Sequence, residues 1–223
     1  MSYASTLEYI HSVKWRGSKP GLSRTRALLA TIGNPERKLR FVHLAGTNGK
    51  GSTAACIASI LQAAGYRVGL YTSPYILRFN ERMQINGLPI SDDELERITD
   101  RIRPYADAMA DAPTEFELIT AVAMDYFAGH ACDLVVLEVG MGGELDSTNV
   151  IDTPECAVIT AMGLDHTREL GATLSEIARA KAGIIKRDGD VAVYGNEPEA
   201  NRVFEQVSAE RHARCLLYTS RCV

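Results

Sequence analysis

Residues suited to binding a phosphate group lie close together in one stretch of the sequence. Phe41–Ala45 is an apolar run that predicts a strand, and glycines follow it at positions 46, 49 and 51. Glycine lets the backbone take left-handed conformations, so that successive N–H groups can converge on phosphate oxygens at the positive end of the next helix. Lys50 would reach the terminal phosphates, and the hydroxyl of Ser52 or Thr53 would bind Mg²⁺ or phosphate. The stretch indicates a nucleotide-binding loop, and the alternative is a glycine-rich turn with a solvated lysine.

The loop departs from the strict phosphate-loop pattern, in which a glycine precedes the glycine–lysine pair by five positions and Ser or Thr follows the lysine. Leu44 stands at the first glycine position, and Gly51 follows Lys50 directly. The segment instead resembles the ATP loop of the Mur-type amide ligases, and its wording is similar to that of the folylpolyglutamate synthase/dihydrofolate synthase family. The resemblance implies that ATP is bound by the residues of the loop, which are Gly46, Thr47, Asn48, Gly49, Lys50, Gly51, Ser52 and Thr53.

The composition is typical of one globular domain. The 223 residues, 46% hydrophobic and 23% charged, can bury one large core. A formal net charge of −4 leaves no general basic surface, which argues against nucleic acid as a partner. The five cysteines are odd in number and include no C-x-x-C pair, which is typical of reduced thiols in the cytoplasm. The N-terminus has no apolar leader and no run of apolar residues is long enough to span a membrane, so we expect a soluble, untargeted, cytoplasmic chain.

Helix and strand patterns alternate along the chain. Capping boxes, in which Glu follows a hydroxyl residue by three positions, predict helix starts at Ser91, Thr114 and Thr173. The Ser91 helix is expected to end at Arg101, because Pro104 lies beyond it. The patterns also predict helices over 3–13, 21–32 and 53–64, strands over 41–45, 66–71, 133–139 and 156–160, and a hairpin on an Asn-Gly turn within 83–90. This order predicts a doubly wound, mostly parallel α/β sheet.

Polar residues follow four of these strands at their carboxyl ends, where open α/β sheets bind ligands. The 46–52 loop follows the first strand, Ser73 the second and Glu138 the third, and Asp165 with His166 comes after the fourth. Taken singly, a strand-end Glu is often a solvated carboxylate and a lone His is often structural. At one shared edge, however, Ser73, Glu138 and His166 would offer ligands to a cation beside the triphosphate, since Mg²⁺ takes few protein ligands and keeps several waters.

The residues around these positions resemble metal-binding segments of the same family. Glu138–Val150 resembles a segment whose glutamate is a magnesium ligand, and Gly163–His166 resembles the segment of its metal-binding histidine. Thr72–Pro74 resembles the segment of its serine ligand, although Tyr75 stands where many members have His. The resemblance therefore implies that Mg²⁺ is held by Ser73, Glu138 and His166.

Lys181 occupies an unexpected place for a charged residue. In the helix that starts at Leu174, it shares one face with Leu174, Ile177 and Ala178. An unpaired charge buried there would cost roughly 4 to 7 kcal/mol, so something must compensate it. Snorkelling or a carboxylate partner would do so. Alternatively, Lys181–Lys186 resembles a family segment whose lysine is carbamylated by CO₂, and the resemblance implies an anionic Lys181 that helps to hold a second Mg²⁺.

The resemblance covers about residues 7 to 190 and implies an ATP-dependent ligase. The γ-phosphate of ATP would move to a carboxylate of dihydropteroate or a reduced folate, and the amine of glutamate would then displace phosphate to form an amide. Lys50, Lys181 and His166 are the implied catalytic residues. The implied binding residues for the acceptor are His11, Ser12, Phe116 and Leu145.

The same resemblance implies a domain organisation like that of the Mur ligase central domain. Residues 1–190 would form the ATP-binding domain with an N-terminal helical arm, and residues 191–223 its end with an atypical tail. The family continues with a second, glutamate-binding domain, which we expect this chain to lack.

Other classes of function stay open. A dinucleotide-binding oxidoreductase would need a third glycine where Leu145 follows Gly140 and Gly142, so this reading is disfavoured. A nucleotide-binding module without ligase activity is the stronger rival, and another Mur-type amino-acid ligase is a further one. We expect a monomer that binds small molecules, with neither nucleic acid nor membrane as a partner.

Overall fold

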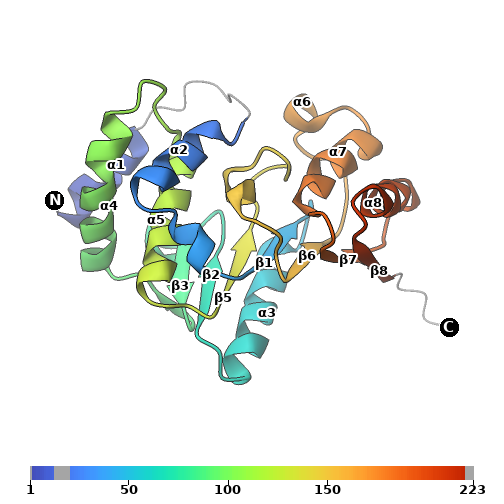
Figure 1. Ribbon diagram of the computed structural model, residues 1–223, viewed down its shortest axis with the longest axis horizontal. Helices are drawn as coiled ribbons and strands as arrows, with labels where there is room; N and C mark the ends of the chain where they lie inside the picture. The colour runs from blue at the N-terminus through green and yellow to red at the C-terminus, as the bar shows by residue number, and fades with distance from the viewer. Residues whose placement is uncertain (1, 13–20, 219–223) are drawn as a thin grey trace.

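The computed structural model describes residues 2–12 and 21–218 and has one central sheet with helices on both faces (Figure 1). Among the described residues the strand order is β4-β3-β2-β5-β1-β6-β7-β8, and the strands from β2 to β8 in that order run parallel. The predicted doubly wound, mostly parallel α/β fold is confirmed. The strands are β1 (Phe41–Ala45), β2 (Val68–Tyr71), β3 (Met83–Ile85), β4 (Leu88–Pro89), β5 (Leu134–Glu138), β6 (Cys156–Ile159), β7 (Asp190–Tyr194) and β8 (Arg214–Tyr218).

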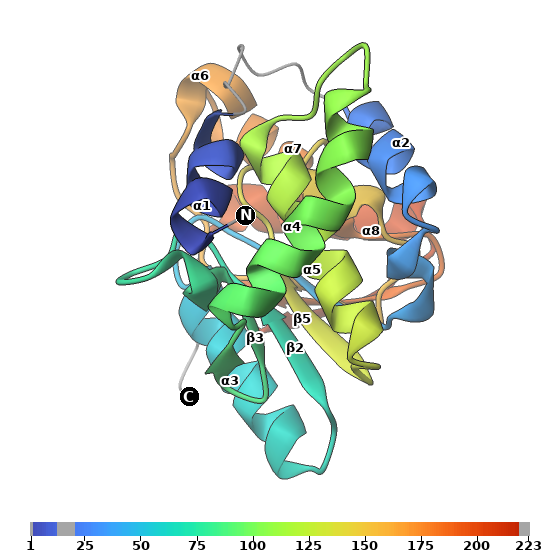
Figure 2. The ribbon, with the colours of Figure 1, turned by 90° about the vertical axis from the view of Figure 1, so that its left-hand side faces the viewer.

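The helices divide unequally between the two faces. On one face, α1, α2, α4 and α5 pack over β1, β2, β3 and β5, and α7 and α8 pack over β6 and β7; Figure 2 looks onto α1, α4 and α5. On the other face, α3 packs against β1, β2 and β5. The α-helices are α1 (Tyr3–Ser12), α2 (Ser23–Thr31), α3 (Lys50–Ala63), α4 (Asp92–Asp107), α5 (Glu115–Gly129), α6 (Thr167–Leu170), α7 (Leu174–Lys181) and α8 (Pro198–Glu210). Short 3₁₀ turns are η1 (Pro35–Lys38), η2 (Phe79–Arg82), η3 (Ser147–Val150) and η4 (Ala182–Ile184).

The register of the central strands brings their carboxyl ends to one edge. Leu44 of β1 lies opposite Glu138 of β5, and Ala45 lies opposite Ile159 of β6. The strands β1 and β5 are almost fully buried because helices cover both of their faces, which explains their continuous apolar sequences. The segments that follow these strands therefore start side by side.

Two helix boundaries differ from the sequence prediction. The helix α3 begins at Lys50 rather than Thr53, because Gly49 adopts a left-handed conformation (φ +80°) and lets the helix start at once. The helix α4 continues through Pro104 to Asp107, and its last turns are held to the core by buried Ile102 and Ala106. Tertiary packing thus outweighs the hydrogen bond that proline cannot donate.

The predicted helix starts at Thr114 and Thr173 are confirmed, each with a reciprocal capping box. At Ser91 only the hydroxyl half is formed, because the side chain of Glu94 bonds instead to His130.

The end of the chain belongs to the same sheet as far as the structure describes it. Strand β7 pairs with β6, and β8 pairs with β7. The predicted loop from residue 15 to residue 20 and the final residues 219–223 of the predicted tail lie outside the described residues. Within the described ranges, no helix is long and apolar enough to cross a membrane.

Candidate functional site

The loop after β1 is held in place by the segment that follows β6. The backbone N–H groups of Thr47 and Asn48 both donate to the carbonyl of Ala161, at 2.9 and 3.1 Å. A side chain at Gly46 would overlap the hydroxyl of Thr160, and its φ of +152° disfavours other residues as well. Glycine is therefore required at this first position of the loop.

Lys50 and Lys181 donate to one carbonyl oxygen. The ammonium group of Lys50 lies 3.2 Å from the Gly46 oxygen, and that of Lys181 lies 2.7 Å from it. Lys181 is only 3% exposed, so its predicted place on the buried stripe of α7 is confirmed. Burial and then the neighbouring charge of Lys50 lower the pKa of Lys181 to about 8. The buried ammonium is received by a main-chain carbonyl, and neither of the two alternatives, a carboxylate partner or snorkelling to solvent, is formed.

Glu138 and Ser73 meet beside the first turn of α3. Glu138 is 3% exposed, and its carboxylate accepts a hydrogen bond of 3.1 Å from the backbone N–H of Ser73. A side chain added at Gly51 would place its first carbon 3.5 Å from the same carboxylate oxygen. Burial raises the pKa of Glu138, against the opposing effects of Ser73 and Lys50. Two of the predicted metal ligands, Ser73 and Glu138, are therefore hydrogen-bonded to each other. They adjoin the loop of residues 46–53 that resembles an ATP loop, called the ATP-type loop below.

His166 is placed differently from these two ligands. It precedes the single-turn helix α6 with a left-handed backbone (φ +49°), and its side chain is 47% exposed. Its ring lies 3.5 Å from the carboxylate of Asp165. In the described ranges, no three His, Cys, Asp or Glu side chains form a cluster able to hold a metal. Among the described residues, His166 makes no hydrogen bond or ion pair to Glu138 or Ser73, so its role as a metal ligand stays a prediction.

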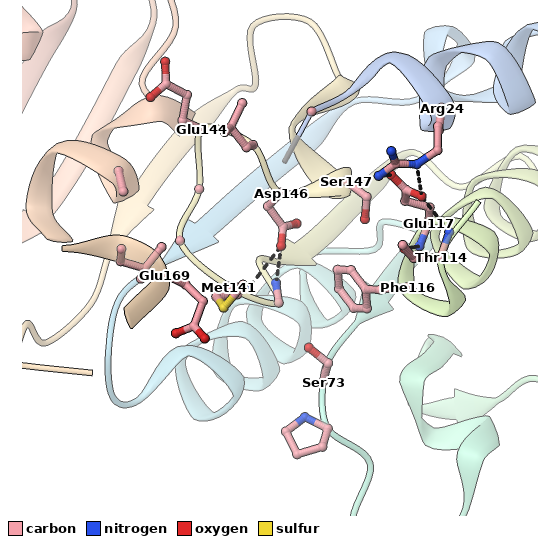
Figure 3. A pocket seen from close by; sticks show the side chains of 18 of the residues that line it. Arg24, Ser73, Thr114, Phe116, Glu117, Met141, Glu144, Asp146, Ser147 and Glu169 are labelled. Atoms are coloured by element: carbon pink, nitrogen blue, oxygen red, sulfur yellow. Dashed lines mark hydrogen bonds and ion pairs between the residues drawn. The ribbon is translucent and has the colours of Figure 1, made fainter. Parts of the chain in front are cut away.

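A pocket of about 560 Å³ opens beside Ser73 (Figure 3). Phe116 and Leu145, two predicted acceptor-binding residues, line it together with the glycine-rich segment 140–143. A side chain at Gly140 would overlap the ring of Phe116, so this glycine gives the ring its place. His11 and Ser12 lie outside the lining; both are exposed, and His11 lies 3.3 Å from the carboxylate of Glu115.

One wall of the pocket is fixed by a buried ion pair. The guanidinium of Arg24 donates to both carboxylate oxygens of Glu117, at 3.0 and 2.9 Å. The backbone N–H of Thr114 donates to the same carboxylate at 2.6 Å, as the capping box requires. Asp111 provides Arg24 with a further contact at 3.3 Å. Such a two-pronged, additionally capped carboxylate is held rigidly.

A second buried carboxylate shapes the glycine-rich segment. Asp146 accepts hydrogen bonds from the N–H groups of Gly140, Met141 and Thr148, at 3.1, 2.9 and 2.9 Å. The hydroxyl of Thr148 is also 2.9 Å from a ring nitrogen of His43. Burial, with a smaller contribution from Lys186, lowers the pKa of His43 to about 3, so this ring is neutral.

No local pattern in the sequence predicts how these wall residues pair. Arg24 lies 93 positions from Glu117, and no local spacing announces the pair. The sequence marks Glu117 as a helix cap and Asp146 as part of the segment 138–150 that resembles the family, but neither signal specifies its partners. The capping box at the start of the apolar helix α5 is the local pattern that singles out Glu117.

The sequence matches the Mur ligase middle domain over residues 44–221. It is 48% identical over 217 residues to a dihydrofolate synthase/folylpolyglutamate synthase of Bacillus subtilis, an alignment that covers 95% of this chain and 50% of that protein.

Solved structures give the same picture. A solved complex of folylpolyglutamate synthase (FPGS) with AMPPCP and folate is similar to this chain with a TM-score of 0.93 at 44% identity. The match covers 97% of this chain and 54% of that one. The folylpolyglutamate synthase of Mycobacterium tuberculosis, complexed with ADP and AMPPCP, has a TM-score of 0.89 at 36% identity, covering 96% and 50%. The chain spans about half the length of the relatives it matches.

Proposed function

This chain belongs to the Mur ligase middle domain family, and we propose that it is the ATP-binding part of a ligase that joins glutamate to dihydropteroate or a reduced folate. The observation that carries the proposal is the continuity of the ATP-type loop with the pocket. Glu138 adjoins the first turn of α3 and bonds to Ser73, and Ser73 lines the pocket. A nucleotide on the loop and an acceptor in the pocket would thus meet at Ser73.

The reaction has two steps. A carboxylate oxygen of the acceptor attacks the γ-phosphorus of ATP, the bond to the β-phosphate oxygen breaks, and an acyl phosphate and ADP result. The amine of glutamate then attacks the acyl carbon, phosphate leaves, and the amine loses a proton as the amide forms. In the first step the chain contributes chiefly position and charge: the N–H groups of the 46–52 loop and the ammonium of Lys50 would bind the phosphates.

The residues around Glu138 fit a magnesium ion. The carboxylate is buried, has one described hydrogen-bond donor and adjoins the loop proposed to bind the triphosphate. A single carboxylate with the hydroxyl of Ser73 suffices, because Mg²⁺ keeps waters and phosphate oxygens as its other ligands. When bound, the ion would neutralise charge on the transferring phosphate.

We further propose that Lys181 is carbamylated and, with His166, holds a second Mg²⁺. The pKa of about 8 leaves an appreciable neutral fraction of the amine at neutral pH, and only the neutral amine can attack CO₂. A nitrogen–carbon bond would form and the nitrogen would lose a proton. Protein incubated with ¹³C-labelled bicarbonate should then show a carbamate carbon signal by NMR that Lys181→Ala lacks. Acetate or formate should restore part of the activity of that variant, and a signal that persists in Lys181→Ala would disprove the assignment.

The test of the ligase is glutamate-dependent release of ADP in the presence of dihydropteroate. Release that requires both co-substrates supports the proposal, whereas release with a different acceptor would indicate another Mur-type ligase. One rival is a nucleotide-binding module without ligase activity. That rival predicts binding of AMPPCP with no ADP release under any combination of substrates. Our proposal places the protein in the cytoplasm as a monomer.

A further inference from the structure

Arg82 is a cation at the end of the pocket that adjoins the ATP-type loop. It is the last residue of η2, and it lines the pocket together with Ser73 and Pro74. Its backbone carbonyl accepts a hydrogen bond of 3.0 Å from Thr72, which fixes it beside the strand that delivers Ser73.

Two aromatic rings hold the guanidinium of Arg82. Its central carbon lies 5.2 Å from the centre of the Tyr75 ring and 5.6 Å from that of Phe79. Aromatic faces attract a guanidinium and restrict its orientation, but they accept none of its N–H bonds in the way a carboxylate does. The rings therefore position the charge without neutralising it.

Arg82 has no carboxylate partner among the described residues. Its Nε atom is buried and makes no hydrogen bond there. The neighbouring carboxylate of Glu81 is occupied, since it accepts from the backbone N–H groups of Ile76, Leu77 and Arg78 at 2.9 to 3.3 Å. A buried donor without an acceptor costs free energy, which a ligand can recover by supplying the acceptor.

The other arginine that lines the pocket shows what a completed pair looks like. Arg24 donates to both oxygens of Glu117, and that carboxylate is also capped by Thr114. Arg82 lines the same pocket, and its guanidinium fork makes no hydrogen bond to an acceptor among the described residues. A carboxylate is the group that matches this fork with two parallel hydrogen bonds.

We propose that Arg82 binds the carboxylate of the acceptor and holds it at the Ser73 end of the pocket, where it would be phosphorylated. The inference rests on the proposed function and adds to it the residue that selects for an ionised acceptor. Arg82 acts here as a binding residue, and its contact would direct one carboxylate oxygen toward the nucleotide.

The test compares two ligands and four proteins. Calorimetry measures the affinity of dihydropteroate and of its carboxamide, which has the same shape without the charge, for wild type, Arg82→Gln, Arg82→Lys and Arg78→Gln. The Arg78→Gln variant is the matched control, because Arg78 lies on the same segment but is exposed and paired with Asp92 outside this pocket. We expect wild type to prefer the carboxylate by about 10- to 100-fold.

Arg82→Gln should lose most of this preference, Arg82→Lys should keep part of it, and Arg78→Gln should keep all of it. A preference that survives in Arg82→Gln would overturn the role of Arg82 and leave the proposed function intact. Failure of wild type to bind dihydropteroate at all would overturn the proposed function and this inference together.

A nucleotide titration separates the acceptor carboxylate from a phosphate as the partner of Arg82. AMPPCP should bind Arg82→Gln and wild type with affinities within about twofold, and melting temperatures should confirm that both are folded. A large loss of AMPPCP affinity in Arg82→Gln would show that the guanidinium serves the nucleotide and would overturn the proposal.

Discussion

Two groups of charged side chains, one in the wall of the pocket and one mainly around the 46–53 loop, differ in how completely they are paired. The wall cluster, formed by Arg24, Glu117 and Asp146, has acceptors and donors matched within the protein. The loop cluster, formed by Lys50, Lys181, Glu138 and Arg82, does not. Glu138 has one described donor, the two lysines share a carbonyl, and Arg82 rests on aromatic rings.

The difference indicates that the wall cluster maintains the structure and that the loop cluster binds ligands. A satisfied buried network gives a region its shape, because breaking one partner leaves a charge without compensation. Groups with spare hydrogen-bonding capacity can instead exchange water for a ligand at little cost to the fold. Mutations in the wall cluster should therefore reduce stability, and mutations in the loop cluster should reduce binding.

The largest expected effect is on stability and comes from the wall cluster. Glu117→Gln leaves the buried guanidinium of Arg24 facing a neutral amide, so the free energy of unfolding should fall by about 3 to 5 kcal/mol. Arg40→Gln is the control, since it removes an exposed pair with Glu155 of similar length, 2.8 Å, and should cost about 1 kcal/mol or less. Urea unfolding of both variants checks this. Equal losses would erase the distinction between the clusters.

The next effect is on nucleotide binding and comes from the loop cluster. Lys50→Ala should weaken the binding of AMPPCP by about 100-fold, or about 2.7 kcal/mol, because a charged donor to the phosphates is lost. The free energy of unfolding should change by less than about 0.5 kcal/mol, since Lys50 only bonds to loop carbonyls. Lys38→Ala, at an exposed lysine of η1, should alter neither quantity. Unchanged AMPPCP affinity in Lys50→Ala would refute the assignment of this loop to phosphate.

A pH titration of stability examines the network behind the wall cluster. The pKa of His43 is about 3 in the folded chain and ordinarily 6.5, so below about pH 6.5 the unfolded chain binds a proton that the folded chain does not. This contribution to stability is complete above pH 6.5 and is lost as the pH falls toward 3. At pH 5 the loss should be about 2 kcal/mol. His43→Gln cannot titrate, so its stability should fall less than that of wild type between pH 7 and pH 5, and parallel curves would contradict the prediction.

The smallest expected effect concerns the metal. Glu138→Gln keeps the shape of the side chain and removes its charge, so Mg²⁺-dependent binding of AMPPCP should weaken by about tenfold, or about 1.4 kcal/mol. The melting temperature should change little, because Glu138 has only one described hydrogen bond to lose. A collapse of the melting temperature with normal Mg²⁺ dependence would contradict the metal-binding role and show that Glu138 is structural, like the residues of the wall cluster.

The same contrast explains how far the sequence could predict the structure. Local signals worked well: the apolar strands, the capping boxes at Thr114 and Thr173 and the glycine-rich loop all lie where the patterns place them. The loop cluster was largely recognisable, since Lys50, Glu138 and Lys181 stand in short segments with their own chemistry. Their types and spacing are visible without knowledge of the tertiary structure.

The wall cluster was not recognisable, because its pairs are made across the fold. Arg24 and Glu117 come from different helices, and nothing near either residue specifies the other. The end of α4 was missed for a similar reason, since burial of Ile102 and Ala106 keeps the helix going past Pro104. His11 and Ser12 stay predictions; the structure shows them exposed and away from the pocket lining.

Lys50 and Lys181 both donate to the carbonyl of Gly46, so nucleotide binding at Lys50 is coupled to the protonation of Lys181. Because Lys181 titrates near pH 8 and its pKa is held down in part by Lys50, phosphates that engage Lys50 would add negative charge nearby and make Lys181 take up a proton. Carbamylation has the opposite sign, since an ammonium group and CO₂ give a carbamate and two released protons. The heat of nucleotide binding in buffers of different ionisation enthalpy therefore carries a proton count, and its sign reports whether nucleotide binding protonates Lys181 or is accompanied by its carbamylation.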